Sequence, residues 1–160
     1  MLLALAVAMT GCGTSSKKKK SGGSGDPSLG GSNEGMTLEL NGDSDSGKAG
    51  GLRTVNFAIN SSALSSSARS TLDSNADYLK ANDSVEVQVE GHCDERGGVQ
   101  YNLALGERRA KAVRDYLIAM GVEGSRVSKI SFGKDRPIAF GHDEDAWGQN
   151  RRANFVVTSK

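Results

Sequence analysis

The densest group of side chains that could do chemistry lies between residues 91 and 98. The stretch reads Gly91-His92-Cys93-Asp94-Glu95-Arg96-Gly97-Gly98. An imidazole, a thiol, carboxylates and a guanidinium this close together could bind a charged ligand, activate a nucleophile or hold a metal ion. The stretch follows a predicted strand and precedes a predicted helix, and this is the position where ligands bind in open α/β sheets. We therefore take it as the candidate site.

Asp94 is the best placed acid of this loop, and the helix after it supplies basic partners. Arg109 lies at the border of the apolar stripe of that helix, whereas Arg108 lies far around it. We therefore expect Arg109 to face back over the loop. An ordinary ion pair between Asp94 and Arg109 that fixes the loop is the alternative, because surface ion pairs are common and individually weak.

Metal binding and nucleophilic catalysis are two further interpretations of the same loop. His92, Cys93 and His142 could suggest a metal site, but neighbouring side chains diverge and a closed zinc site needs four ligands. Cys93 follows a strand instead of opening a helix, and no third group is evident to orient a base. We expect no metal, no cofactor and no enzymatic activity, with Cys93 packed under the sheet edge.

The elements that must position this loop follow from hydrophobic periodicity. Val85, Val87 and Val89 alternate with polar residues, which predicts a half-buried strand. Asn102 is a plausible N-cap and Gly121 a stop for the strongest helix. Strands are predicted at 53–59, 84–90, 127–132 and 153–158, and helices at 64–82, 103–120 and 143–152. This β-α-β-α-β-α-β order predicts an α/β sandwich, a mixed four-stranded sheet packed on helices.

Composition divides the 160-residue chain into two unlike parts. All eight aromatic residues follow residue 50, whereas 11 of the 21 glycines precede residue 51. A core is therefore expected only in residues 51–160, and residues 13–50 are predicted to be a flexible Gly/Ser-rich tether. The 20 basic residues nearly balance the 19 acidic ones, which argues against a protein that coats nucleic acid.

The N-terminus carries a signal of its own. Residues 1–9 are an uninterrupted apolar run, too short to span a bilayer, and Thr10-Gly11-Cys12 follows. A small residue before a Cys at this place resembles the lipobox of bacterial lipoproteins, which implies cleavage before Cys12 and lipid on it. No basic residue precedes the run, as expected of a truncated signal peptide. The predicted parts are a signal at 1–11, a lipidated tether at 12–50 and a domain at 51–160.

Longer motifs carry a family resemblance. They are the 91–97 loop, Tyr101 to Ala110, Phe132 to Pro137, and Asn150 to Ala153. Together they resemble the peptidoglycan-associated lipoproteins (Pal), outer-membrane lipoproteins with an OmpA C-terminal-like domain, over about residues 52–158. The resemblance implies a non-enzymatic protein that binds peptidoglycan and tethers the outer membrane to the wall. It also implies a periplasmic domain, a lipid anchor, and TolB and other Tol proteins as partners in envelope integrity and cell division.

The resemblance further implies which residues bind the ligand, the diaminopimelate of the peptide stem. Asp94 and Arg109 match the two main contacts, and Asn102, Leu105 and Phe57 match other positions at the pocket. Arg96 could also reach the ligand. The free end of diaminopimelate is a zwitterion, so that Asp94 can accept hydrogen bonds from its ammonium while Arg109 forks onto its carboxylate.

One stretch departs from the family pattern. The first strand of the family ends in a Phe-Asp-Phe-Asp-like run, whereas this chain has Phe57-Ala58-Ile59-Asn60. If family members contact the ligand through the acidic side chain at this position, its replacement by Ala58 should weaken ligand binding. If the contact is made by the backbone, binding should change little. The missing acid favours one rival interpretation, a module that mainly binds protein. The other rival is a cell-wall hydrolase that uses Cys93.

Overall fold

The computed structural model describes residues 37–160, so Cys12, the predicted signal peptide and the first part of the tether lie outside the described residues. The elements are β1 (Val55–Asn56), α1 (Ser66–Ala81), β2 (Glu86–His92), α2 (Val99–Ala119), a 3-10 turn η1 (Gly124–Arg126), β3 (Val127–Gly133), α3 (Glu144–Asn150) and β4 (Arg152–Ser159). The predicted alternation of strands and helices is confirmed. The first strand is shorter than predicted, because only two of its residues pair with the sheet.

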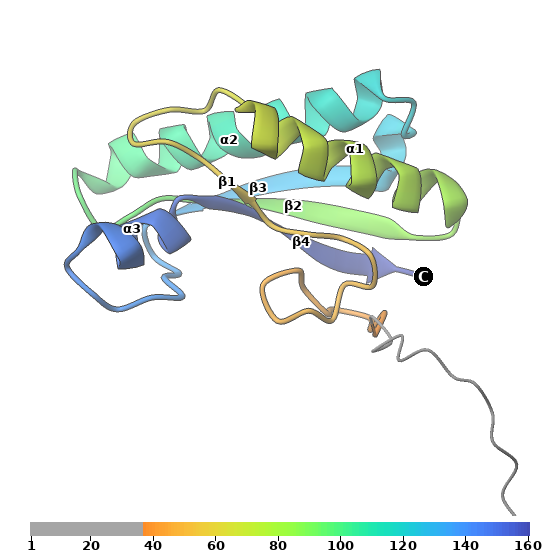
Figure 1. Ribbon diagram of the computed structural model, residues 1–160, viewed down its shortest axis with the longest axis horizontal. Helices are drawn as coiled ribbons and strands as arrows, with labels where there is room; N and C mark the ends of the chain where they lie inside the picture. The colour runs from red at the N-terminus through yellow and green to blue at the C-terminus, as the bar shows by residue number, and fades with distance from the viewer. Residues whose placement is uncertain (1–36) are drawn as a thin grey trace, which may run out of the picture. The chain divides into compact units, whose positions relative to one another are not determined.

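The strands form one mixed sheet in the order β1-β4-β2-β3. β2 runs parallel to β3, and β4 runs antiparallel to both β1 and β2. Helices α1 and α2 cover one face of this sheet (Figure 1). Between them lies the core, which includes Leu72, Leu79, Val87, Val89, Val113, Leu117 and Phe155. No helix within residues 37–160 is both long and apolar enough to cross a membrane.

Helix α2 begins one turn earlier than predicted. Gly98 is its N-cap, so the prediction of Asn102 as N-cap is wrong. The Asn102 amide instead donates hydrogen bonds to the carbonyl oxygens of Arg96 at 2.8 Å and Gly98 at 3.2 Å. The helix end is as predicted, since Gly121 follows it with a φ of +94°, where glycine is favoured.

Two glycines set how closely α2 approaches the sheet. A Cβ atom on Gly91 would lie 1.9 Å from the carbonyl oxygen of Gly106, and one on Gly106 would lie 2.3 Å from Oγ of Ser131. Both distances are far below van der Waals contact. The helix can therefore lie against β2 at this level only because neither position has a side chain.

Residues 37–50 pack on the domain, so the prediction that the flexible tether extends to residue 50 is wrong. The backbone N–H of Asn41 donates to the Val157 carbonyl at 2.8 Å, and that of Ser44 donates to the Phe155 carbonyl at 2.9 Å. The Val157 N–H donates to the Gly42 carbonyl at 3.0 Å. Figure 1 shows this segment beside β4. Composition missed it because main-chain bonds to a strand edge leave little trace in side-chain type.

Candidate functional site

Asp94 lies in the loop between β2 and α2 and is held there by two arginines. Its Oδ1 accepts hydrogen bonds from the Arg96 backbone N–H at 3.1 Å and from Arg96 Nε at 3.3 Å. Its Oδ2 lies 2.7 Å from Arg96 Nη2 and 3.4 Å from Arg151 Nη1. Burial alone raises the pKa of Asp94, but the hydrogen bonds from Arg96 outweigh burial and hold that pKa below its ordinary value. The loop therefore presents a carboxylate that is charged at neutral pH.

Arg109 is fully buried below this loop. Its Nε donates to the Ser61 carbonyl at 2.9 Å, its Nη2 to the Ala58 carbonyl at 3.0 Å, and its Nη1 to the His92 carbonyl at 2.7 Å. Burial lowers the pKa of the guanidinium, which nonetheless stays charged at any physiological pH. As expected, Arg109 turns toward the loop. Within residues 37–160, however, no ion pair joins it to Asp94.

The other predicted contacts surround these two residues, at different depths. Asn102, Leu105 and Phe57 are buried, and the Phe57 ring centroid lies 5.2 Å from the Arg109 guanidinium carbon. Arg96 is at the rim, with its side chain 34% exposed and its guanidinium carbon 3.9 Å from the Trp147 ring centroid. The three buried side chains therefore position the loop, while Arg96 faces solvent.

An open cavity of about 330 Å³ lies above Asp94. It is lined by Ile59, Asn60, Asp94, Arg96, Gly97 and Tyr101. Neither Tyr101 nor Ile59 is among the ligand-binding residues predicted from the sequence. Both are exposed hydrophobic residues, Ile59 in the turn after β1 and Tyr101 in the first turn of α2. Exposure of this kind depends on the fold, so no signal in the sequence indicates them.

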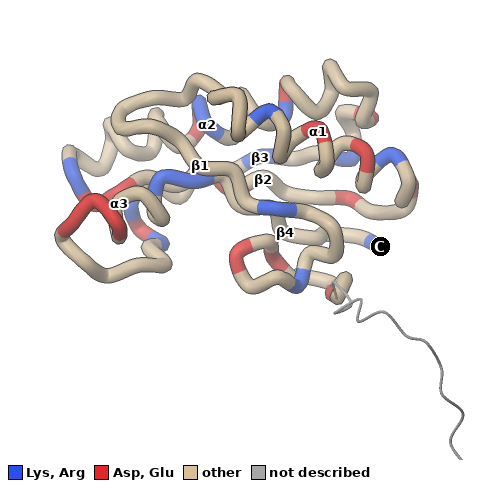
Figure 2. Tube along the Cα trace, in the orientation of Figure 1, with Lys and Arg blue, Asp and Glu red and all other residues tan. Residues whose placement is uncertain are grey.

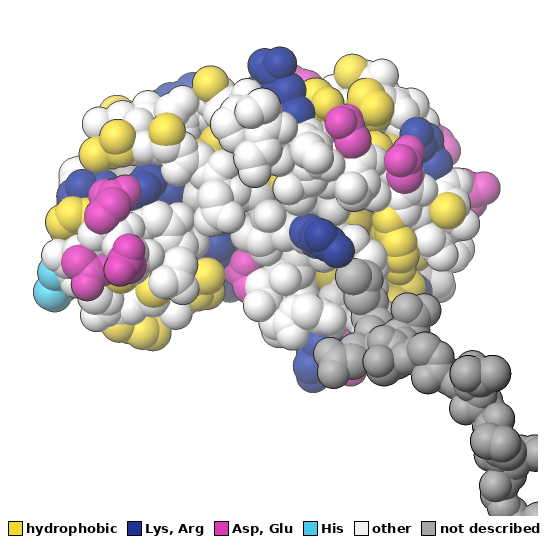
Figure 3. Space-filling model, viewed as in Figure 1, with side chains coloured by type: hydrophobic (Ala, Val, Ile, Leu, Met, Phe, Trp, Pro, Cys, Tyr) yellow, Lys and Arg dark blue, Asp and Glu magenta, His cyan; other side chains and the backbone are white. Residues whose placement is uncertain are grey.

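Arg151 was also missed as a site residue. It begins the turn into β4 and joins three elements, because its Nε donates to the Phe57 carbonyl at 3.1 Å, its Nη1 faces Asp94, and its Nη2 pairs with Glu144. Figure 2 shows basic residues at the start of β4 close to acidic residues at the start of α3. Figure 3 shows acidic and basic side chains side by side at this end of the molecule. Arg96, Arg109 and Arg151 thus lie near the carboxylates of Asp94, Glu95 and Glu144, so the site offers charges of both signs to a ligand.

Cys93 lies directly beneath the site. Its side chain is buried, with Sγ 3.4 Å from the Asn102 carbonyl oxygen and 3.5 Å from Arg109 Nη1. Burial raises the pKa of the thiol, against the pull of the Arg109 charge. Because the thiolate is the nucleophile, this environment is unfavourable for nucleophilic catalysis.

The two histidines, His92 and His142, contact different carboxylates and differ in exposure. His92 is buried beside Glu90, whereas His142 is exposed and its Nδ1 lies 2.6 Å from Glu95 Oε1. Trp147 Nε1 donates to the same Glu95 oxygen at 2.9 Å. In the part of the chain that the structure describes, no cluster of His, Cys, Asp and Glu side chains could hold a metal ion.

Comparison with known proteins finds one family for most of the described chain. The model of the OmpA family matches residues 56–152. The peptidoglycan-associated lipoproteins of Pseudomonas aeruginosa and Pseudomonas putida are 44% and 43% identical to this chain; each match covers 97% of this chain and 92% of the relative.

Solved structures give the same result. The crystal structure of the peptidoglycan-associated lipoprotein from Burkholderia pseudomallei is 42% identical, with a TM-score of 0.63, and the match covers 66% of this chain and 89% of that one. The cell wall anchor of the T6SS from Pseudomonas aeruginosa is 26% identical, with a TM-score of 0.58, over 67% of this chain and 80% of that one.

Proposed function

This chain belongs to the OmpA family and, within it, to the peptidoglycan-associated lipoproteins, and on that basis we propose that it binds peptidoglycan non-covalently through the diaminopimelate of the peptide stem. The observation that carries this proposal is the charged Asp94 carboxylate at the floor of an open cavity. The ammonium of a zwitterion would replace part of the Arg96 contact to Asp94 with charge-assisted hydrogen bonds of its own. The ligand carboxylate would then meet the surrounding guanidinium groups.

Two guanidinium groups could receive that carboxylate, and they differ in access. Arg96 is at the rim, and its guanidinium can turn to the ligand carboxylate once the ligand ammonium has replaced part of its contact to Asp94. Arg109 is covered by the turn at residues 58–61, whose carbonyl groups accept its hydrogen bonds. We assign the first contact to Arg96 and the deeper one to Arg109, reached when the ligand displaces the Ser61 carbonyl from Nε. Residues 58–60 of this turn are exposed, so such a shift would not require the hydrophobic core to repack.

The departure from the family pattern at Ala58 fits this proposal. The Ala58 carbonyl oxygen, rather than a side chain, contacts Arg109 at 3.0 Å. A backbone contact does not depend on the side chain at that position. The missing acid therefore removes no hydrogen bond that Arg109 makes in this structure.

The remaining parts of the proposal rest on family membership. Cys12 would carry the lipid that anchors the chain in the outer membrane, with the domain in the periplasm. TolB and other Tol proteins would be its partners during envelope constriction. More than one acyl chain is needed for stable anchoring, because a single chain binds membranes only marginally.

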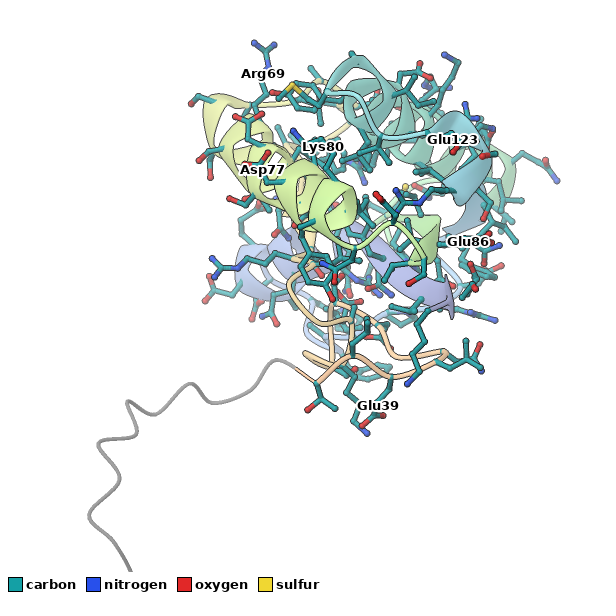
Figure 4. All side chains as sticks on the ribbon, turned by 90° about the vertical axis from the view of Figure 1, so that its right-hand side faces the viewer. Glu39, Arg69, Asp77, Lys80, Glu86 and Glu123 are labelled. Atoms are coloured by element: carbon teal, nitrogen blue, oxygen red, sulfur yellow. The ribbon has the colours of Figure 1, made fainter. Side chains whose placement is uncertain are left out.

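Co-sedimentation of the full chain with purified sacculi tests the binding site. Asp94→Asn keeps the side-chain shape but removes the charge, and we expect the apparent affinity to fall about tenfold or more, since a hydrogen bond to a charged group contributes about 1.5–3 kcal/mol. Asp77→Asn is the matched control, because Asp77 lies on α1, pairs with Lys80 at 2.8 Å, and is at the end of the molecule away from α3 (Figure 4). Equal binding by the Asp94 variant and the wild type would reject the site.

The same assay separates the two rival functions. A wild-type chain that does not pellet with sacculi would reject wall binding and favour a module that binds protein. Soluble wall fragments released by the wild type but not by Cys93→Ala would indicate a hydrolase. We expect neither, because the buried Cys93 thiol has a raised pKa.

A further inference from the structure

A second cavity, of about 450 Å³, lies on the other side of the sheet from α2. Gly91 faces α2, and side chains alternate along a strand, so its neighbours Glu90 and His92 face away from the helix. Both line this cavity, together with Arg136 and Asn154. We call it the back cavity. Asp94 and Arg109 are not among its lining residues.

His92 is the first sign that the back cavity holds a ligand. Its side chain is 1% exposed, and within residues 37–160 neither ring nitrogen has a hydrogen-bond partner. Nε2 lies 3.4 Å from Glu90 Oε2 without forming a hydrogen bond, and the ring stacks on Phe132 at a centroid distance of 5.7 Å. A buried polar group without a hydrogen-bond partner is unfavourable, because it has lost its bonds to water and gained none in return. A ligand that offers polar hydrogens to His92 would remove that penalty.

Glu90 and Arg136 are the second sign. Arg136 Nη1 is 3.7 Å from Glu90 Oε1, which is too long for a hydrogen bond, and Asn154 Nδ2 is 3.4 Å from Glu90 Oε2. The Arg136 guanidinium carbon sits 3.6 Å from the Phe132 ring centroid, which fixes its plane beside the cavity. Opposite charges therefore stand side by side in one cavity, and within residues 37–160 no hydrogen bond joins the Arg136 guanidinium to the Glu90 carboxylate.

The other ion pair of the back cavity is already complete. Arg152 Nε donates to Asp45 Oδ2 at 2.7 Å, and both side chains are largely buried. Asp43 also lines the cavity, and its Oδ1 accepts a hydrogen bond from the Ser46 backbone N–H at 2.8 Å. Of the remaining charged or ionisable lining residues, Glu90, His92 and Arg136 are the ones that we consider for a ligand. In the described part of the chain these side chains form no group that could hold a metal ion.

We propose that the back cavity binds a small zwitterion of the amino-acid type. Its ammonium donates to the Glu90 carboxylate and to a ring nitrogen of His92, while its carboxylate accepts from Arg136. A lone amine or a lone carboxylate would satisfy one side of the Glu90–Arg136 pair and leave the other unmatched. This site goes beyond the wall-binding function proposed above and does not depend on it.

One residue, His92, contributes to both the back cavity and the first site. The main-chain carbonyl of His92 accepts the hydrogen bond from Arg109, while its imidazole lines the back cavity. An occupant of the back cavity therefore contacts the residue that helps to hold Arg109.

NMR titration of the full chain with alanine tests the proposal. We expect saturable shifts of the His92 ring protons and of the Asn154 side-chain amide at millimolar alanine. Methylamine and acetate, at matched ionic strength, should bind at least about tenfold more weakly, because each leaves one charge unmatched. Arg136→Gln should weaken alanine binding by about tenfold or more, and its side chain is 60% exposed, so the variant is expected to fold.

Two controls separate this site from the first one. Asp94→Asn should leave the alanine-induced shifts of His92 unchanged, whereas Glu90→Gln should remove them. No saturable shift at His92, or binding that Arg136→Gln leaves intact, would overturn the proposal. Equal binding of methylamine and alanine would overturn the assignment to a zwitterion. Loss of sacculus binding in Asp94→Asn with intact alanine binding in the same variant would show that the two sites are independent.

Discussion

Arg109 Nη1 donates a 2.7 Å hydrogen bond to the main-chain carbonyl of His92, so a charge from the middle of α2 is bound at the end of β2. The same guanidinium also holds the carbonyl groups of Ala58 and Ser61. One side chain therefore connects the helix, the strand and the turn that follows β1. Arg109 positions the site even before any ligand contacts it.

Removing this side chain should destabilise the whole domain. Arg109→Ala leaves the buried His92 carbonyl and two part-buried carbonyl groups of the turn at residues 58–61 without this donor, and it opens a cavity in place of a fully buried side chain. We expect the free energy of unfolding to fall by about 3 kcal/mol or more. Urea denaturation followed by circular dichroism measures it. Arg108→Ala is the matched control, since Arg108 is the exposed neighbour, and it should change stability by no more than about 0.5 kcal/mol. Equal effects of the two substitutions would contradict the central role of Arg109.

Because α2 and β2 approach closely, we expect alanine substitutions at two glycines, Gly91 and Gly98, to have very different effects on stability. Gly91→Ala would place a methyl group 1.9 Å from the Gly106 carbonyl oxygen, so the helix must move or the domain unfold. We expect a loss of about 3 kcal/mol or more, or no folded protein. Gly98→Ala adds a methyl group in open space at a φ of −75° and should be tolerated. A tolerated Gly91→Ala would show that α2 can shift without loss of the fold.

The ionisation of Asp94 predicts how the site responds to acid. Its folded-state pKa lies below its unfolded value, so its contribution to stability is complete above the unfolded value and is lost as pH falls through the folded one. The difference in unfolding free energy between wild type and Asp94→Asn should therefore be largest near pH 7 and shrink below about pH 4. A difference that stays constant down to pH 2 would show that the charge of Asp94 is not what stabilises the loop.

The contact between His142 and Glu95 should respond to the opposite change in pH. The hydrogen bond to Glu95 raises the pKa of His142 above its ordinary 6.5, so the contact is complete below that value and is lost as pH rises through the raised one. Trp147 shares the Glu95 oxygen and is the one tryptophan of the sequence, which makes its fluorescence a specific reporter. We expect a fluorescence transition above pH 6.5 that His142→Gln abolishes. The same transition in His142→Gln would assign it to another group.

The fold could be predicted from sequence because its elements are amphipathic over their full length. Val85, Val87 and Val89 face the core as their alternation indicates, and α3 begins within one residue of its predicted start, with Asp143 as its N-cap. Errors arose where main-chain bonds, rather than apolar side chains, decide the structure. The packing of residues 37–50 on β4 and the early start of α2 at Gly98 are the two examples.

The site was less accessible to such reasoning. Asp94 could be identified from the loop, and Arg109 from the helix border together with the family resemblance. The sequence did not reveal that Arg109 would bond to carbonyl groups instead of to Asp94. Nor did it reveal Arg151, because that residue reaches Asp94 across 57 positions of the chain. Contacts between distant loops depend on tertiary packing, which local periodicity does not encode.

The segment at residues 37–50 has a mechanical consequence if the chain is anchored ahead of it. Tension applied there would load first the bonds made by Thr37, Leu38 and Glu39, and then the three backbone bonds that join residues 41–44 to β4. Their release would free up to about 45 Å of chain before the pairing of β1 with β4 is strained. The segment would then act as a reserve of length, letting the distance between anchor and domain grow under load while the ligand site keeps its shape.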